Sequence, residues 1–165
     1  MCGDTALIRL LTLPVQVVFD TGSSSLEFAS TYRIFPYHFL NPQIDGTGTL
    51  CASCNQVKFD SSKSSTFVDG GRTTSITFGT GVGVDPVVGD NYSLTLRSAK
   101  DVVTVGGLVA KATNLFLITD QTPKFNIDPF SGIQGMGAQA QGFFASLISQ
   151  GLPCKLSIQK KETLF

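Results

Sequence analysis

The chain has 165 residues, no net charge and only 15% charged residues. Its twelve Lys and Arg residues form no basic stripe, so there is no electrostatic case for a nucleic-acid partner. No apolar run reaches the roughly 20 residues that a membrane-spanning helix requires, so we expect no membrane partner.

The remaining composition predicts an all-β globular domain. It combines 42% hydrophobic residues with 17 glycines and many short runs of Val, Thr, Ser and Phe. The apolar segment 6–18 lacks the charged start and cleavage pattern of a secretory signal, so we expect it to lead into the first strand. Strands are expected, in chain order, at residues 15–19, 26–29, 73–78, 91–96, 102–105 and 113–118, with 73–78 and 91–96 forming a hairpin around the glycine-rich link 79–89.

One short helix is expected, at residues 142–150. Its apolar side chains fall on one face of a helix with 3.6 residues per turn. Gly151 is placed to cap its C-terminus and Pro153 to stop it. The predicted apolar face consists of Phe143, Phe144, Leu147 and Ile148.

Asp20 is the leading candidate for a catalytic residue. It follows the apolar run Val17-Val18-Phe19 and precedes Thr21 and Gly22, and Gly22 can end a strand in a tight turn. A carboxylate at such a strand end can act as a general base on water if a second acid lies beside it. The same tripeptide is also consistent with a simple Asx turn, in which the Asp hydrogen-bonds its own backbone.

Segments in order along the chain resemble the pepsin-like aspartic proteases (peptidase A1), and fungal members most of all. Residues 19–24 are similar to the family's active-site segment, and residues 59–67 to its F-x-P-S-x-S-S-T-F stretch. Residues 76–81 resemble the flap, residues 130–137 the F-D-G-I-L-G-L-G strand and turn, and residues 143–152 the helix after it.

This resemblance implies a single lobe of the bilobal pepsin-like fold. Residues 1–153 would form the N-terminal lobe, with a possible irregular insertion at 31–50. Residues 154–165 would be an atypical tail, and both segments are hypothesised to be gene-model artefacts in a truncated chain. The family implies secretion and no cofactor.

The implied activity is that of an aspartic endopeptidase acting on peptides or proteins through an Asp-activated water. Asp20 would be one member of the catalytic pair. Support for the site would come from Thr21, Gly22, Ser23, Ile133 and Gly135, with Ser23 bonding Asp20 from outside. The flap over a bound peptide would include Phe78, Gly79, Thr80 and Gly81.

Four positions depart from the family pattern. Phe78 replaces the flap tyrosine, and Glu27 replaces the tryptophan that often follows the first motif. Those two side chains are usual partners, so their losses go together. Ser131 stands for the aspartate of F-D-G, and Gln134 for an apolar residue.

The sequence contains one Asp-Thr-Gly. Asp45-Gly46 and Asp69-Gly70 lack the hydroxyl residue and the apolar lead-in. Activity would therefore need a second lobe or a homodimer. The alternative is an inactive truncated fragment or a peptide-binding remnant.

Cys51 and Cys54 form a C-x-x-C pair. A zinc site would need further ligands, but there is no second C-x-x-C and His38 is the only histidine. A redox motif would need a βαβ unit, which the pattern does not show. The family resemblance implies a Cys51–Cys54 disulfide, with free thiols as the alternative.

A second motif, at residues 135–140, matches the dinucleotide fingerprint G-x-G-x-x-A. No βαβ alternation surrounds it, and no acidic residue follows about twenty positions later. A glycine turn that joins a strand to a helix is the better interpretation.

Overall fold

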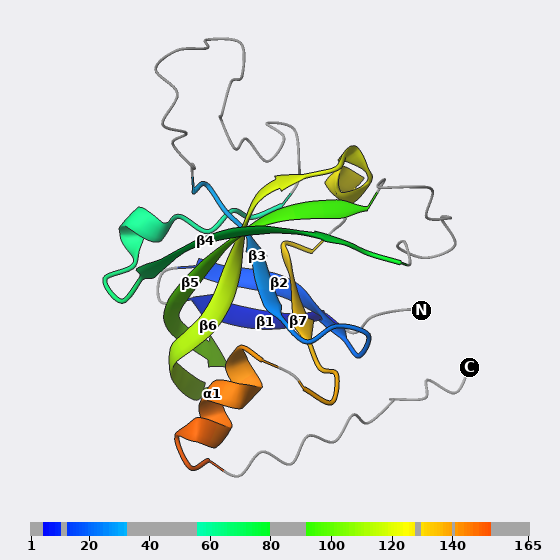
Figure 1. The fold of residues 1–165 in the computed structure, drawn as a ribbon. Coiled ribbons are helices and arrows are strands. Elements are labelled where there is room, and N and C mark those ends of the chain that lie inside the picture. Colours follow the sequence, from blue (N-terminus) through cyan, green and yellow to red (C-terminus); the bar gives the residue numbers. More distant parts are fainter. Residues whose placement is uncertain are drawn as a thin grey trace, which may run out of the picture.

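Strands dominate the computed structural model, which describes residues 5–10, 13–32, 56–79, 92–127, 130–139 and 141–152. Within these ranges seven strands form one sheet in the order β1-β2-β7-β3-β6-β5-β4 (Figure 1). The all-β prediction is confirmed. The expectations for Thr80, Gly81, Cys51, Cys54, most of 31–50 and the tail 154–165 lie outside the described residues.

The sheet curls on itself, because β1 pairs with β2 on one edge and with β5 on the other. None of the described helices is long and apolar enough to cross a membrane. The strands are β1 (Thr5–Leu10), β2 (Leu13–Asp20), β3 (Leu26–Ala29), β4 (Val68–Thr77), β5 (Ser93–Val105), β6 (Leu108–Gln121) and β7 (Gly132–Gly135), and the helix is α1 (Phe143–Ser149). Two 3-10 turns cover Ser61–Lys63 and Pro123–Ile127.

Two apolar clusters lie on opposite faces of β3, because alternate side chains of a strand point to opposite faces. Leu26 and Phe28 belong to the larger cluster, together with Leu115 and Leu117 of β6. Ala29 belongs to the second cluster. That cluster also contains Tyr92, Leu94, Leu96, Ile118 and Phe125, with Ile76, Phe78 and Phe116 at its edge.

Three strand predictions need correction. The strands expected at 91–96 and 102–105 are joined in one long strand, β5, which begins at Ser93, and the strand at 113–118 is part of the longer β6. Polar residues such as Asp101 interrupt the apolar pattern, and β5 passes them through a bulge in its pairing with β6. Gly106 and Gly107, both with positive φ, then form the tight turn between the two long strands.

The apolar segment 6–18 also differs from the prediction, which placed its first strand at 15–19. It folds as an antiparallel hairpin in which Leu10 of β1 lies opposite Leu13 of β2. The one usual turn residue in this apolar run, Pro14, lies inside β2, so the sequence pattern does not reveal where the chain reverses.

The predicted helix is confirmed, although one residue of its apolar face is misplaced. Phe143 and Leu147 are buried against the sheet, whereas Ile148 is 60% exposed. Each helical residue is rotated by about 100° from the last, so Ile148 turns away when Leu147 faces the core. Gly151, at φ 77°, caps the helix as expected: its N–H binds the Ile148 carbonyl, and the Leu152 N–H binds that of Leu147.

Candidate active site

Asp20 is the last residue of β2, where it lies beside Gly135 of the parallel neighbour β7. The chain then turns through residues 21–25 and returns as β3 on the other side of β7 (Figure 1). The Gly22 N–H donates to Asp20 Oδ1 at 2.9 Å. The Asx turn considered for this motif is therefore present. It coexists with a half-buried carboxyl whose Oδ2 is not engaged by that turn.

Four backbone hydrogen bonds, donated by β7 and the segment after it, hold this turn in place. Gly135 N donates to Ser25 O at 2.7 Å, Met136 N to Asp20 O at 2.7 Å and Gly137 N to Ser23 O at 2.9 Å. A fourth bond runs from Gln141 N to Ser24 O at 2.6 Å. We call residues 20–25 the active-site turn. Its position is set by main-chain atoms of β7 and of the segment after it.

Gly135 makes this close approach possible. A Cβ atom at position 135 would lie 2.5 Å from Ser24 N, a distance that side chains do not tolerate. At Gly132, in the same strand, a Cβ would lie 2.3 Å from the Glu27 carbonyl oxygen. Ile133, between them, is buried and pairs with Val18 on one side and Glu27 on the other.

Thr21 and Ser23, the other two residues expected to support the site, differ in their exposure to solvent. Thr21 is exposed, so its expected contact across a lobe interface stays a prediction. The Ser23 hydroxyl is buried and has no hydrogen-bond partner in the part of the chain that the structure describes. The expected Ser23–Asp20 bond is thus not formed here, and Asp20 Oδ1 takes the Gly22 N–H instead.

Phe78 follows β4 and closes the second cluster. Its N–H donates to Tyr92 O at 2.9 Å, and its ring packs edge-on against Phe125 with centroids 5.7 Å apart. Tyr92 contacts the same Phe125 ring at 5.3 Å. Phe78 is therefore anchored by aromatic packing, while Gly79 beside it is exposed.

Asp69, the other Asp-Gly acid among the described residues, is not available for a similar role. Arg97 Nε and Nη2 donate to its two carboxylate oxygens, each at 2.8 Å, and Tyr32 Oη donates to Oδ2 at 2.8 Å. The Arg97 guanidinium holds the pKa of Asp69 well below its usual range. Asp69 is part of a surface ion pair, so it cannot act as a proton donor at ordinary acid pH.

Comparison with known proteins decides the family, since a family model described as eukaryotic aspartyl protease matches residues 13–153. The chain belongs to the eukaryotic aspartyl protease family. It is 33% identical to Rhizopuspepsin-4 of Rhizopus niveus over 149 residues, which cover 85% of this chain and 30% of that relative. It is 30% identical to Syncephapepsin of Syncephalastrum racemosum (86% and 30% covered) and 32% identical to dog Renin (83% and 30% covered).

The chain thus spans about 30% of the length of the aspartyl proteases that it matches. Its strands and single described helix form one lobe of the pepsin-like fold, as the sequence predicted.

Two of the four departures from the aspartyl protease pattern have a structural account. The Ser131 hydroxyl accepts a 2.7 Å hydrogen bond from Val57 N, so this short side chain ties the residue before β7 to the segment before the first 3-10 turn. Gln134 is fully buried, and its Nε2 donates to Gly135 O at 2.7 Å. Its Oε1 has no partner among the described residues.

Glu27 is the feature that sequence reasoning undervalued. Its side chain is 1% exposed, and its carboxyl receives the Ser25 hydroxyl on Oε1. Oε2 has no hydrogen-bond partner within the described ranges. Burial raises the pKa of Glu27, the Ser25 bond lowers it, and the charge of Asp20 raises it again. The sequence feature that could have revealed the importance of Glu27 is an acidic residue inside the otherwise apolar strand Leu26-Glu27-Phe28.

The dinucleotide interpretation of residues 135–140 loses its physical basis. A phosphate site needs free backbone N–H groups at the glycine turn. Here the N–H groups of Gly135, Met136 and Gly137 all donate to the active-site turn. The described residues also contain no group of three or more His, Cys, Asp or Glu that could hold a metal.

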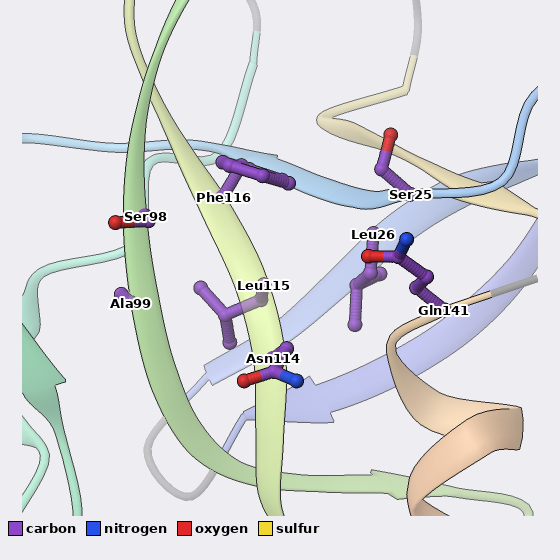
Figure 2. Close-up of a pocket in the computed structure, with 8 residues that line it drawn as sticks. All are labelled: Ser25, Leu26, Ser98, Ala99, Asn114, Leu115, Phe116 and Gln141. Carbon is purple, nitrogen blue, oxygen red and sulfur yellow. The ribbon is translucent and has the colours of Figure 1, made fainter. Parts of the chain in front are cut away.

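A cavity of about 160 Å³ lies on the flank of the turn rather than at Asp20. Figure 2 shows Leu26 and Gln141 on one side of this cavity and residues of β5 and β6 on the other side. The Ser25 hydroxyl points away from Leu26. The cavity is lined by Ser25, Leu26, Ser98, Ala99, Asn114, Leu115, Phe116 and Gln141. Neither Asp20 nor Phe78 lines it, so we do not assign it to the active site.

Proposed function

We propose that this chain supplies one half of the catalytic site of an aspartic endopeptidase. The observation that carries the proposal is the Asp20 carboxyl at the end of β2, on a turn that the backbone hydrogen bonds of Gly135, Met136, Gly137 and Gln141 hold in place. Such preorganisation keeps a reacting carboxyl in one position without a cost at the moment of reaction. Membership of the aspartyl protease family supports the same role.

The reaction requires a second carboxyl close to Asp20. One carboxylate takes a proton from a bound water as it attacks the amide carbon, and a neighbouring carboxylic acid protonates the carbonyl oxygen. Two carboxyls at such a distance titrate as a coupled pair, since both cannot ionise easily. This sequence holds one Asp-Thr-Gly, so the second acid must come from another lobe or from a second copy of the chain.

The substrate class is a peptide or protein chain. The segment that begins at Phe78 and Gly79 would cover it, because the hairpin of β4 and β5 carries this segment to the edge of the second cluster. The exposed Thr21 would contact the second lobe. A secreted location and a Cys51–Cys54 disulfide belong to the same proposal, and both rest on the family alone.

A second candidate is an inactive remnant that only binds peptides. The observation in its favour is the pair of departures at Phe78 and Glu27. Phe78 has no hydroxyl to donate, and Glu27 is engaged with Ser25. A lobe with one carboxyl and a flap segment of this kind could hold an extended peptide without cleaving it.

Complementation separates the two candidates. The chain is mixed at acid pH with the separately produced C-terminal lobe of a rhizopuspepsin, and cleavage of a denatured protein is followed together with complex formation. We expect cleavage in the mixture and none from either lobe alone. A stable complex that fails to cleave would instead favour the peptide-binding remnant.

A further inference from the structure

The cavity beside the active-site turn has two walls that belong to different parts of the lobe. Ser25 of the turn, Leu26 of β3 and Gln141 form one wall, and residues of β5 and β6 form the other (Figure 2). The walls meet close to Gly142, where an added Cβ would lie 2.6 Å from Leu26 Cβ and 3.4 Å from the Asn114 carbonyl oxygen. The chain is therefore closely packed where the two walls join.

The lining of this cavity combines an apolar surface with amide groups at the rim. Leu26, Ala99 and Leu115 are almost fully buried, whereas Asn114 and Gln141 are exposed. The side-chain amides of Asn114 and Gln141 have no hydrogen-bond partner among the residues that the structure describes. None of the eight lining residues carries a charge. The cavity therefore suits a neutral molecule with an apolar body and a polar group at one end.

The size of the cavity matches a single six-membered ring. Its volume is about 160 Å³, and a dry apolar cavity of about 150 Å³ binds benzene. Water against the apolar walls forms few hydrogen bonds, so a ring that displaces it gains affinity. The half-buried Phe116 side chain lines the cavity, and aromatic pairs are favoured beyond the area that they bury. An aromatic ring is thus the apolar body that fits best.

The wall formed by Ser25 and Gln141 also takes part in holding the active-site turn. The Gln141 N–H donates to Ser24 O at 2.6 Å, and Ser25 belongs to the turn itself. A local opening that breaks the Gln141–Ser24 bond separates residues that line the cavity. A bound molecule must leave before such an opening, so it stabilises the closed turn.

We propose that this cavity is a binding site for a neutral, single-ring aromatic molecule with one hydrogen-bonding substituent, such as a phenol, and that its occupant holds the active-site turn closed. The ring lies against Leu26, Leu115 and Phe116, and the substituent binds the amide group of Asn114 or Gln141. This is a second site, and its binding step does not depend on the proposed protease role of the chain.

NMR titration of the full chain with 4-fluorophenol at millimolar concentration tests the place and the class of ligand. The backbone amides of Leu26, Leu115 and Gln141 and the side-chain amides of Asn114 and Gln141 should show saturable shifts. The affinity should exceed that for fluorobenzene about fivefold, as expected for one neutral hydrogen bond. The absence of saturable shifts, or shifts confined to the second cluster, would overturn the proposal.

A double variant, Asn114→Ala with Gln141→Ala, tests the amide groups at the rim. Both side chains are exposed, so the fold should persist. This variant should bind 4-fluorophenol and fluorobenzene with equal affinity. Lys111→Ala is the control, because it truncates an exposed side chain of β6 that does not line the cavity, and it should keep the preference. A preference that survives the double variant, or that the wild type lacks, would contradict the assigned ligand class.

Amide hydrogen exchange tests the effect on the active-site turn. With 4-fluorophenol at about nine times its Kd, exchange of the Gln141 N–H should slow about tenfold, because only the closed turn binds the ligand. The Gly151 N–H, which donates to Ile148 O at the end of α1, should exchange at the same rate with and without ligand. An unchanged Gln141 rate at saturation would overturn the link to the turn. Failure of the complementation assay would affect none of these measurements.

Discussion

Gly135→Ala is expected to destabilise the lobe by at least about 3 kcal/mol, the upper part of the range for overpacking a closed site. The added Cβ would meet three backbone atoms of Ser24 at 2.5–2.6 Å. Backbone cannot rotate away as a flexible side chain could, so β7 and the active-site turn would have to separate. Urea unfolding followed by circular dichroism measures the loss.

Gly79→Ala is the matched control for this change. Gly79 is exposed, and a Cβ there would have nothing within 4 Å. We expect its unfolding free energy to lie within about 0.5 kcal/mol of the wild type, as for most surface substitutions. Equal urea-unfolding midpoints for Gly135→Ala and Gly79→Ala would show that the active-site turn does not depend on the contact between β7 and Ser24.

Asp20→Asn is expected to reduce cleavage by the complemented enzyme by at least about 10³-fold, in line with the loss of a general base. The fold should persist, because the Asn side-chain oxygen can still accept the Gly22 N–H that Asp20 Oδ1 accepts now. The rate of peptide cleavage is measured on lobes whose complex formation has been checked by size-exclusion chromatography.

Asp120→Asn serves as the control for the Asp20 variant. Asp120 is an exposed aspartate on β6 whose Oδ1 accepts the Gln121 N–H, so the chemical change is the same and the place is different. Its cleavage rate should equal that of the unmodified chain. If Asp20→Asn retained the wild-type rate, a residue other than Asp20 would have to activate the water.

Local patterns predicted the parts of this fold that depend on local interactions. β3 begins and ends at the expected residues, and the helix lies where its apolar period and Gly151 placed it. The strand, glycine and hydroxyl order around Asp20 also predicted the turn correctly, since Gly22 donates to Asp20 Oδ1.

Features that depend on tertiary pairing were harder to predict. The hairpin between β1 and β2 has no turn residue between Leu10 and Leu13. β5 continues through the buried Asp101, whose Oδ1 accepts hydrogen bonds from Ser64 Oγ, Thr66 Oγ1 and the Val102 N–H, while Oδ2 has no partner among the described residues. Glu27 was identified as a departure from the family pattern. Its burial depends on the pairing of β3 with β6 and β7, which lie far away in sequence.

Phe78 and Glu27, the two departures from the family pattern on the flap side of the lobe, make separate contacts. Phe78 packs on Phe125, while Glu27 accepts the Ser25 hydroxyl. Phe78 keeps the aromatic packing of the second cluster, whereas Glu27 leaves its Oε2 without a partner among the described residues.

The activity of the chain alone tests the central claim most directly. Acid-pH cleavage of a denatured protein is measured at a concentration where sedimentation shows the 165-residue chain to be monomeric. We predict no cleavage that pepstatin inhibits, because one monomer supplies one Asp-Thr-Gly carboxyl. Pepstatin-sensitive cleavage by the monomer that Asp20→Asn abolishes would contradict the claim that this chain carries only half of the site.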